Sequence, residues 1–403
     1  MTLGFWIPVG SRDEVGELTG VTHFIEHLLF KGSRKYSAEQ IAQIFDTLGG
    51  ELNAATSREY VVVYGRFLDE QLTQAMDVLV DMLLTPTFAD LDREREVVLE
   101  EIAMYEDSPQ DLIHDVLAET VFGTHPLGHP VLGSRETIAR MSEERIRAYH
   151  RRHFRFSDMV VAAAGNIDHD RLRELLLAEH GDRDGVGAAR QTVPPDFAPR
   201  RAFLAKETEQ MHVCLGGEGL ARNDPRRFVL SVLDSLLGGS LSSRLFQEVR
   251  EKRGLVYSIY SFSNMYRETG LCGVYFGCRP DRLAQVMQTV TAELERVGRE
   301  AVPLDELARA KEHLKGRMIL GLESTASRMT RLGKAVLTDS EILSLDEIAE
   351  RIDAVTQEDV LELAARVFSP RDLTVVGIGA DADLFREAVP AVGSLLVKDG
   401  GVV

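Results

Sequence analysis

Two histidines and a glutamate lie within five residues near the start of the chain, in the stretch His23-Phe24-Ile25-Glu26-His27. In a helix, residues four apart share a face, so both imidazoles project to one side with the carboxylate beside them. Catalytic zinc uses imidazole and carboxylate ligands, keeps one position open for water, and needs a base near that water. The spacing His-x-x-Glu-His is the inverzincin signature, and it predicts His23 and His27 as zinc ligands and Glu26 as the base.

The same five residues also fit a helix in which two partly buried histidines simply pair with Glu26. The neighbouring side chains of Phe24, Ile25 and Leu28 are apolar. Burying three polar side chains among them costs free energy unless something binds those side chains. This consideration favours a metal site over the purely structural pairing.

A third ligand has to come from another element, and the acidic segment 91–105 is the best source. Glu94 and Glu101 are two helical turns apart and project to nearly the same side, whereas Glu96 and Glu100 lie off that side. One of the pair would be a ligand, and the other would orient a histidine. Spacing alone does not choose between them.

The elements that must position these residues indicate an α+β fold. Two β-rich stretches, 52–56 and 60–67, are separated by a short polar turn, as in an antiparallel hairpin, and 256–262 and 271–278 repeat this arrangement. Helical periodicity predicts further elements at 38–48, 72–84 and 91–105. We expect mainly antiparallel sheets with helices packed on them.

The two halves of the chain are related in sequence pattern. A capped helix that begins after Ser142 and leads to an apolar strand recurs at a constant offset after Thr356. Residues 181–200 are rich in Gly, Asp and Pro, which indicates a linker. We therefore predict an N-terminal zinc-binding domain at 1–180 and a homologous, metal-free domain at 201–403, with one zinc ion per chain.

The composition narrows the class of protein. The net charge of −18 disfavours nucleic acid as a partner, because phosphate contacts need clustered Lys and Arg. Three cysteines without a framework (Cys214, Cys272 and Cys278) favour a reducing compartment. No apolar run is long enough to span a membrane, and the start resembles neither a signal nor a transit peptide. We expect a cytoplasmic protein that does not bind membranes.

Segments 10–14 and 20–33 resemble the pitrilysin family of inverzincin metallopeptidases, in particular mitochondrial processing peptidase β-subunits and short bacterial processing-protease homologues. Segment 49–59 matches too, and the similarity covers nearly the whole chain. The resemblance implies that Glu101 is the third zinc ligand and that Glu94 supports the site from outside the ligand set. Members of the family usually begin with a further strand well before segment 10–14, but here Met1 stands only nine residues before Gly10. Either the N-terminal sheet lacks an edge strand or the true start lies upstream.

The resemblance also implies substrate contacts. Segment 245–258 is similar to a family segment whose Arg and Tyr contact the substrate near the metal, and these residues are Arg250 and Tyr257 here. Without the resemblance, Arg250 would fit better as part of a surface ion pair and Tyr257 as a core residue of a strand. Asn53 and Ala54 resemble an edge strand to which an extended substrate adds as a further strand. A role for Asn53 in merely shaping the strand fits equally well.

These features predict a zinc endopeptidase that hydrolyses peptides or unfolded segments in a closed chamber, using zinc-activated water and Glu26. In related proteins two such chains, or one of double length, enclose the chamber, so the resemblance implies a dimer. We expect a homodimer, because one chain carries both the metal site and the substrate contacts. One alternative is the catalytic subunit of a heterodimer with a homologous metal-free partner. Another is a non-catalytic structural subunit of the same fold.

Overall fold

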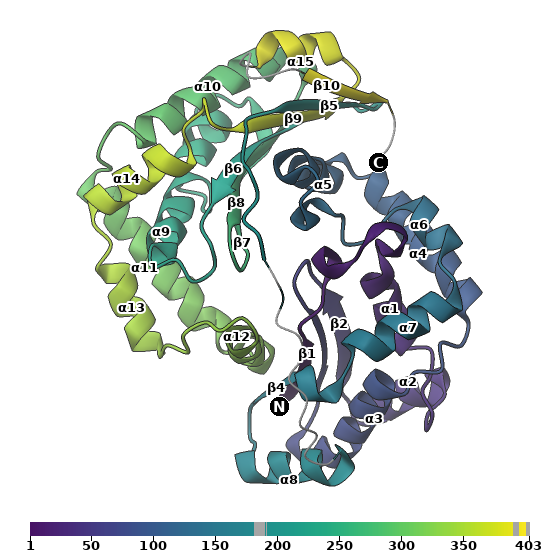
Figure 1. Ribbon diagram of the computed structural model, residues 1–403. Coiled ribbons are helices and arrows are strands. Elements are labelled where there is room, and N and C mark those ends of the chain that lie inside the picture. The colour runs from purple at the N-terminus through teal and green to yellow at the C-terminus, as the bar shows by residue number, and fades with distance from the viewer. Residues whose placement is uncertain (181–189, 191, 390–394, 400–403) are drawn as a thin grey trace. The chain divides into compact units, whose positions relative to one another are not determined.

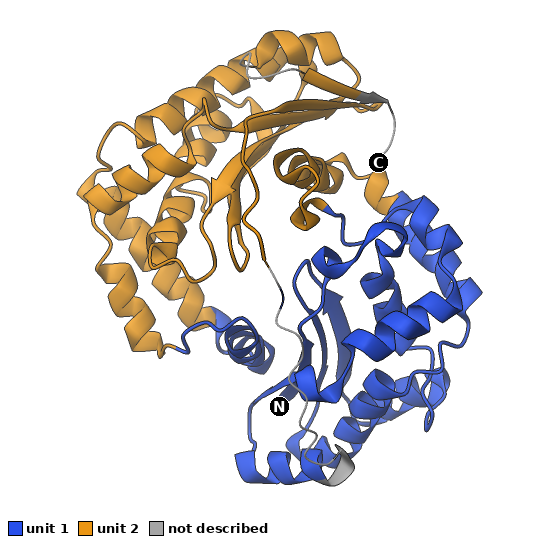
Figure 2. Cartoon of the chain, viewed as in Figure 1, with its two compact units in different colours: residues 1–103, 129–191, 321–342 blue, residues 104–128, 192–320, 343–403 orange. Residues whose placement is uncertain are grey.

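The structure is a computed structural model that describes residues 1–180, 190, 192–389 and 395–399 (Figure 1). The chain forms two compact units, each of helices and a mainly antiparallel sheet (Figure 2). The predicted α+β fold with two domains is confirmed. Unit 1 comprises residues 1–103, 129–191 and 321–342, and unit 2 comprises residues 104–128, 192–320 and 343–403. Among the described helices, none combines the length and the apolarity needed to cross a bilayer.

Unit 1 is built on an antiparallel sheet. Its strands are β1 (Thr2–Ile7), β2 (Glu51–Thr56), β3 (Val61–Arg66) and β4 (Val160–Ala164), in the order β2-β3-β1-β4. Strands β2 and β3 form the predicted hairpin, with β2 at the edge. Because side chains alternate across a strand, Phe5 and Val63 point into the main core of the unit, while Trp6 and Val62 point to the opposite face.

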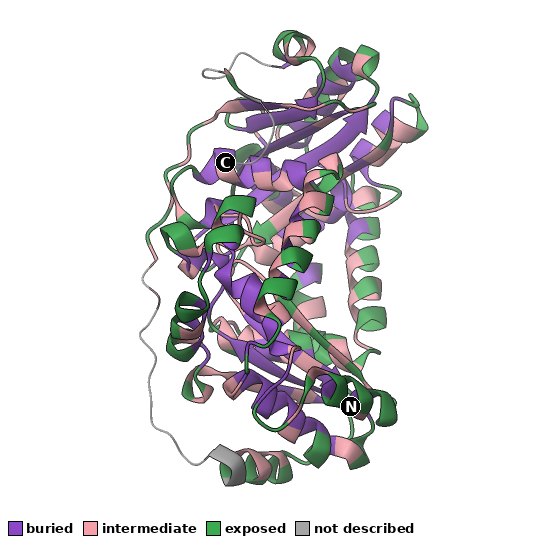
Figure 3. Cartoon of the chain, turned by 90° about the vertical axis from the view of Figure 1, so that its right-hand side faces the viewer, coloured by how far each residue is buried: buried purple, intermediate pink, exposed green. Residues whose placement is uncertain are grey.

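Helices cover both faces of this sheet, and buried residues gather on the strands and the inner sides of the helices (Figure 3). The helices that lie wholly or mainly in unit 1 are α1 (Val21–Leu29), α2 (Ala38–Thr47), α3 (Leu72–Leu84), α4 (Leu91–Glu106), α6 (Arg135–Arg140), α7 (Glu143–His153), α8 (His169–His180) and α12 (Thr325–Leu337). Helix α12 comes from the second half of the sequence and packs on β1 and β4. The Trp6 indole N–H donates to Met329 Sδ at 3.3 Å, and Gly333 provides the space that the indole ring needs.

Unit 2 repeats this plan with a larger sheet. Its strands are β5 (Arg201–Ala205), β6 (Met211–Gly219), β7 (Val256–Met265), β8 (Gly270–Cys278), β9 (Thr374–Gly379) and β10 (Leu395–Asp399), in the order β10-β5-β9-β6-β8-β7. Strands β7, β8, β6 and β9 correspond in order and direction to β2, β3, β1 and β4. Strands β5 and β10 add in parallel beyond β9. Among the described residues, unit 1 has no strand in these two places, at the outer edge of β4.

The helices of unit 2 include one from the first half of the sequence. They are α5 (Pro109–Phe122), α9 (Arg227–Leu237), α10 (Leu283–Val297), α11 (Leu304–Gly321), α13 (Leu345–Asp353), α14 (Gln357–Val367) and α15 (Ala382–Ala388). Helix α5 packs on β6 and β9, where Leu117 lies against Gly216. Each sheet is therefore covered on one face by a helix from the other half of the sequence. The compact units differ in these segments from the predicted ranges 1–180 and 201–403, and half of the predicted linker, residues 181–189 and 191, lies outside the described residues.

Candidate metal centre

Helix α1 presents the residues of the His-x-x-Glu-His stretch at the margin of the unit 1 core. Its apolar residues Phe24, Ile25 and Leu28 are fully buried and anchor the helix. His23 is buried as well, with 7% of its surface exposed, whereas Glu26 and His27 are half-buried. The helical period therefore places the polar side chains where the core ends.

Helix α4 brings Glu101 to the two histidines. Its Oε2 lies 3.1 Å from His27 Nε2 and 3.6 Å from His23 Nε2, and the two imidazole centroids are 4.7 Å apart. One donor atom from each of the three side chains lies within 4.8 Å of the others. In the part of the chain that the structure describes, they form the one convergent group of three or more His, Cys, Asp or Glu donors. Glu96 and Glu100 are exposed on the same helix.

Glu94 lies against the other ring nitrogen of His27. Its Oε2 is 3.6 Å from His27 Nδ1, and its Oε1 forms an ion pair of 2.9 Å with Lys31 Nζ. Glu94 is 3% exposed, so this charge is buried next to its partners. The two glutamates that are seven residues apart on α4 therefore contact opposite nitrogens of one imidazole.

Glu26 is held by Thr56, a residue that no sequence pattern singled out. The Thr56 hydroxyl donates a hydrogen bond to Glu26 Oε2. Thr56 is the last residue of β2, the strand that carries Asn53 and Ala54. The edge of the sheet thus reaches the carboxylate beside the two histidines.

Burial and neighbouring charges shift the pKa values of these side chains, and the shifts of His23 and Glu101, but not that of His27, favour metal binding. Burial, together with the nearby His27, lowers the pKa of the His23 imidazole to about 4 against the opposing charge of Glu101. Burial also acts to lower the pKa of His27, but the hydrogen bond and charge of Glu101 outweigh it and this pKa is raised. The hydrogen bond from His27 lowers the pKa of Glu101, whereas burial raises the pKa of Glu26 against the hydrogen bond from Thr56. Metal binding needs neutral imidazole and ionised carboxylate, which His23 and Glu101 provide.

The three donors fit a zinc ion in type, and Glu101 fits it in its spacing from both histidines. Two imidazole nitrogens and one carboxylate oxygen are a ligand set of catalytic zinc sites. Tetrahedral ligands at about 2.0–2.1 Å from zinc lie roughly 3.4 Å from one another. The distances of 3.1 and 3.6 Å between Glu101 Oε2 and the two Nε2 atoms bracket this value.

Strand β2 is an edge strand of its sheet, so part of its backbone faces away from β3. The Ser57 N–H donates to Tyr60 O at 2.8 Å, which continues the antiparallel ladder between β2 and β3. Because groups in such a ladder alternate in direction, Ala54 and Thr56 turn their N–H and C=O groups away from β3. The Asn53 side-chain oxygen accepts the Ala54 N–H at 2.8 Å. Asn53 therefore covers one of the outward donors.

Arg250 and Tyr257 lie together in unit 2 on two irregular pieces of backbone. Arg250 belongs to a π-helix, Phe246–Glu251, and Tyr257 lies in a bulge at the start of β7. The Arg250 guanidinium stands 4.7 Å from the centroid of the Tyr257 ring and 4.7 Å from that of Phe246. Tyr257 is 77% exposed, so the alternative that it is a strand core residue is wrong. π-Helices and bulges are frequent at functional sites, where they redirect side chains.

The His-x-x-Glu-His motif, the signature of inverzincins, lies here on a helix beside an acidic helix. Residues 1–135 match the family described as Insulinase (Peptidase family M16), and residues 140–314 match the Peptidase M16 inactive domain. An uncharacterized zinc protease of Streptomyces coelicolor is 44% identical over 390 residues, which cover 93% of this chain and 84% of the relative. The chain belongs to peptidase family M16, and the predicted family is confirmed.

Solved structures share the fold over almost the whole chain. A peptidase M16 inactive domain from Pseudomonas fluorescens has a TM-score of 0.87 at 22% identity, covering 94% of this chain and 93% of that one. A chain in complex III2 from Candida albicans has a TM-score of 0.82 at 22% identity, covering 95% and 91%. At these identities the likeness establishes the fold alone.

Proposed function

We propose that the chain is a zinc-dependent endopeptidase in which His23, His27 and Glu101 hold one zinc ion and Glu26 is the general base. The convergence of these three donors beside Glu26 carries the proposal. The name zinc protease given to the Streptomyces relative supports it. A zinc ion held there would acidify a water molecule and polarise the scissile carbonyl.

Glu26 moves the proton in this proposal. Its carboxylate takes a proton from the attacking water and passes it to the nitrogen of the leaving amine, so that the C–N bond breaks without leaving a bare amide anion. The hydrogen bond from Thr56 fixes the carboxylate in one orientation. Burial raises the pKa of Glu26, which makes it a stronger base near neutral pH.

Glu94 supports the site through His27. A carboxylate next to the non-ligating nitrogen of a histidine ligand fixes the tautomer and orientation of the ring. The contact of Glu94 with His27 Nδ1 supports this role, and its ion pair with Lys31 holds the buried side chain in position.

The substrate would bind as an additional strand along the open edge of β2. Extended peptides that add to a sheet edge gain affinity from backbone hydrogen bonds, with little dependence on sequence. The Ala54 N–H is one of the outward donors, and Asn53 would have to release it when the substrate binds. Thr56 then places the substrate backbone close to Glu26.

Replacing Ala54 by proline tests this binding mode. Proline removes the outward N–H, and an edge strand tolerates it where no ladder bond is lost. Loss of one hydrogen bond of about 1 kcal/mol should raise KM roughly fivefold, with unchanged zinc content. The control is Ala55→Pro, which removes a donor facing β3 and should destabilise the hairpin instead. An unchanged KM in the Ala54 variant would remove β2 from substrate binding.

Arg250 and Tyr257 are the substrate contacts that we assign to unit 2. A phenol O–H can stabilise a developing oxyanion, and a guanidinium can bind a carbonyl or carboxylate of the peptide. Tyr257→Phe keeps the ring that stacks on Arg250 and removes only the hydroxyl. We expect kcat to fall about 100-fold with zinc content unchanged. Tyr260→Phe is the control, because this tyrosine lies on the same strand but its hydroxyl forms a hydrogen bond of 2.8 Å with His114 Nε2. An equal fall of kcat in both variants would contradict the assignment of Tyr257.

We also propose that residues 1–180 act as the zinc-binding domain, 181–200 as the linker and 201–403 as the substrate-contacting domain. Two such chains would form a homodimer around a closed chamber. Light scattering, zinc analysis and a peptidase assay on the purified chain test this together. We expect an active particle of twice the 44.8 kDa chain mass with one zinc per chain. Activity only after addition of a homologous metal-free chain would favour the heterodimer. A zinc-free particle without activity would favour a structural subunit.

A further inference from the structure

The N-terminus of helix α1 is capped by a residue outside the helix. Four N–H groups at the start of a helix lack partners within it, and a polar side chain at the N-cap position usually serves one of them. Here the N-cap is Gly20, which has no side chain. The N–H groups of Gly20 and Thr22 instead donate to the carboxylate of Glu14, at 2.6 Å to Oε2 and 2.8 Å to Oε1. Glu14 is 1% exposed, so one buried carboxylate serves two helix donors.

The backbone that carries Glu14 is tied to the turn of the β2–β3 hairpin. The Ser11 N–H donates to Ser57 O at 3.2 Å, and the Arg12 N–H donates to Arg58 O at 3.1 Å. These bonds attach segment 10–14 to the sheet whose edge strand ends at Thr56. The position of Glu14 is therefore defined relative to the strand that contacts Glu26.

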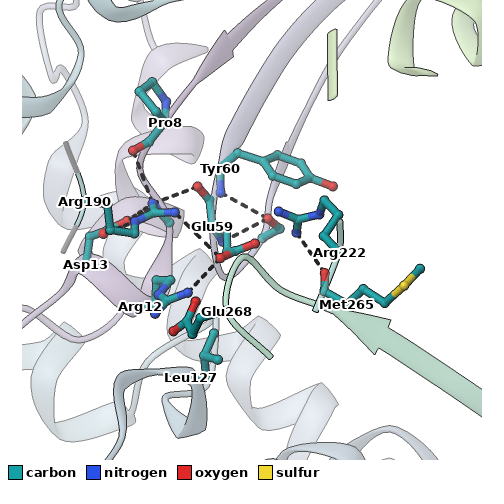
Figure 4. A network of polar contacts seen from close by, with 12 residues as sticks. Pro8, Arg12, Asp13, Glu59, Tyr60, Leu127, Arg190, Arg222, Met265 and Glu268 are labelled. Atoms are coloured by element: carbon teal, nitrogen blue, oxygen red, sulfur yellow. Dashed lines mark hydrogen bonds and ion pairs between the residues drawn. The ribbon is translucent and has the colours of Figure 1, made fainter. Parts of the chain in front are cut away.

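Side chains of the same segment hold it from two further directions. Arg12 forms an ion pair of 2.7 Å with Glu59, and these side chains are only 4% and 3% exposed. Asp13 accepts hydrogen bonds from the Arg190 guanidinium, whose Nε lies 2.7 Å from Oδ1 (Figure 4). Removing one partner of a buried ion pair is strongly destabilising, so Arg12 and Glu59 hold each other in place. Glu14 thus extends from a rigid segment.

The first turn of α1 is packed closely on its other side. Gly20 has φ of 90°, and a Cβ there would stand 2.7 Å from Leu132 O and 2.9 Å from Gly133 Cα. The Thr22 hydroxyl lies 3.2 Å from the Tyr149 hydroxyl. The start of α1 is therefore confined between Glu14 and these neighbours.

We propose that Glu14 is a positioning residue of the metal centre: by capping α1 it sets where the imidazoles of His23 and His27 stand relative to Glu101. His23 follows Thr22 directly, and His27 lies one turn further along the same helix. Metal ligands must be held within about 0.5 Å of their productive positions. A small displacement of α1 would change both imidazole positions at once and so weaken zinc binding. This inference rests on the proposed zinc site.

A graded series at position 14 tests the proposal, with the zinc dissociation constant as its readout. Glu14→Gln leaves one acceptor oxygen for two N–H donors, and Glu14→Asp keeps the carboxylate but withdraws it by one methylene. Competition of each purified protein with a chromophoric chelator for Zn²⁺ should show an affinity about 10–100-fold weaker in Glu14→Gln, as for partners that orient a ligand, and a smaller loss in Glu14→Asp. Thermal unfolding of the zinc-free proteins measures stability separately.

Asp81→Asn is the matched control, because Asp81 is also buried in unit 1 and accepts a backbone N–H, that of Lys35 at 2.8 Å. It should lower the unfolding temperature and leave zinc affinity unchanged. If Glu14→Gln binds zinc as tightly as the parent chain, the positioning role is overturned and Glu14 is only structural. If Glu14→Gln does not fold, the Glu14→Asp variant decides. A zinc affinity in Glu14→Asp equal to that of the parent chain would also overturn the positioning role. A parent chain that binds no zinc would instead overturn the proposed function.

Discussion

Glu26→Gln should abolish peptide cleavage while the protein retains its zinc. Glutamine has nearly the same shape and still offers an oxygen to the Thr56 hydroxyl, but it cannot accept a proton from water. A positioned general base contributes about 10²–10⁴-fold to a rate, so kcat should fall by at least that range. Peptidase kinetics and metal analysis on the same preparation measure both quantities.

Thr56→Val is the companion variant, because it removes the hydrogen bond and leaves the base. We expect it to lower kcat less than Glu26→Gln does, since the carboxylate loses orientation but keeps its ability to take a proton. Full activity in Glu26→Gln would exclude the general-base role. Loss of zinc from the Glu26→Gln variant would indicate that Glu26 is a zinc ligand, and the proposed roles of Glu26 and Glu101 would then have to be exchanged.

Local periodicity predicted the elements that carry the candidate site. The four-residue spacing of His23 and His27 requires only a helix, and the apolar residues Phe24 and Ile25 require that this helix lie against a core. The β2–β3 hairpin is similarly local, because alternation and a short polar turn define it. Such features depend on neighbours in the sequence, so the sequence contains the information that determines them.

The exchange of helices between the two halves could not be predicted in this way. An amphipathic pattern shows that α12 has an apolar side, but not which sheet that side covers. The pairing of Trp6 with Met329 and the space at Gly333 join residues more than 300 positions apart. Without a second sequence, nothing marks these residues as partners. The compact units therefore contain the segments 104–128 and 321–342, which continuous ranges do not describe.

The same limit applies to the supporting residues of the site. Glu14 and Thr56 contact α1 through hydrogen bonds whose geometry depends on the folded loop and on the strand end. Their sequence neighbours, a Gly-rich turn and an edge strand, indicate loops and strands but no partner. Arg250 and Tyr257 approach each other through a π-helix and a bulge, and neither irregularity follows the 3.6-residue or two-residue period that the sequence pattern reveals.

Glu101→Gln should cause the largest loss of zinc of any single change on α4. The carboxylate oxygen that lies between the two Nε2 atoms would be replaced by a neutral amide oxygen, which is a weaker ligand for a dication. The loss of affinity should exceed the roughly 10–100-fold expected for Glu94→Gln, which only orients His27. Zinc dissociation constants of the two variants test this order. Glu100→Gln is the matched control, since it makes the same chemical change one residue away on the exposed side of α4 and should leave zinc binding intact. If Glu100→Gln lost zinc and Glu101→Gln did not, Glu100 would be the third ligand. The side of α4 that carries Glu100 would then be the side that faces α1.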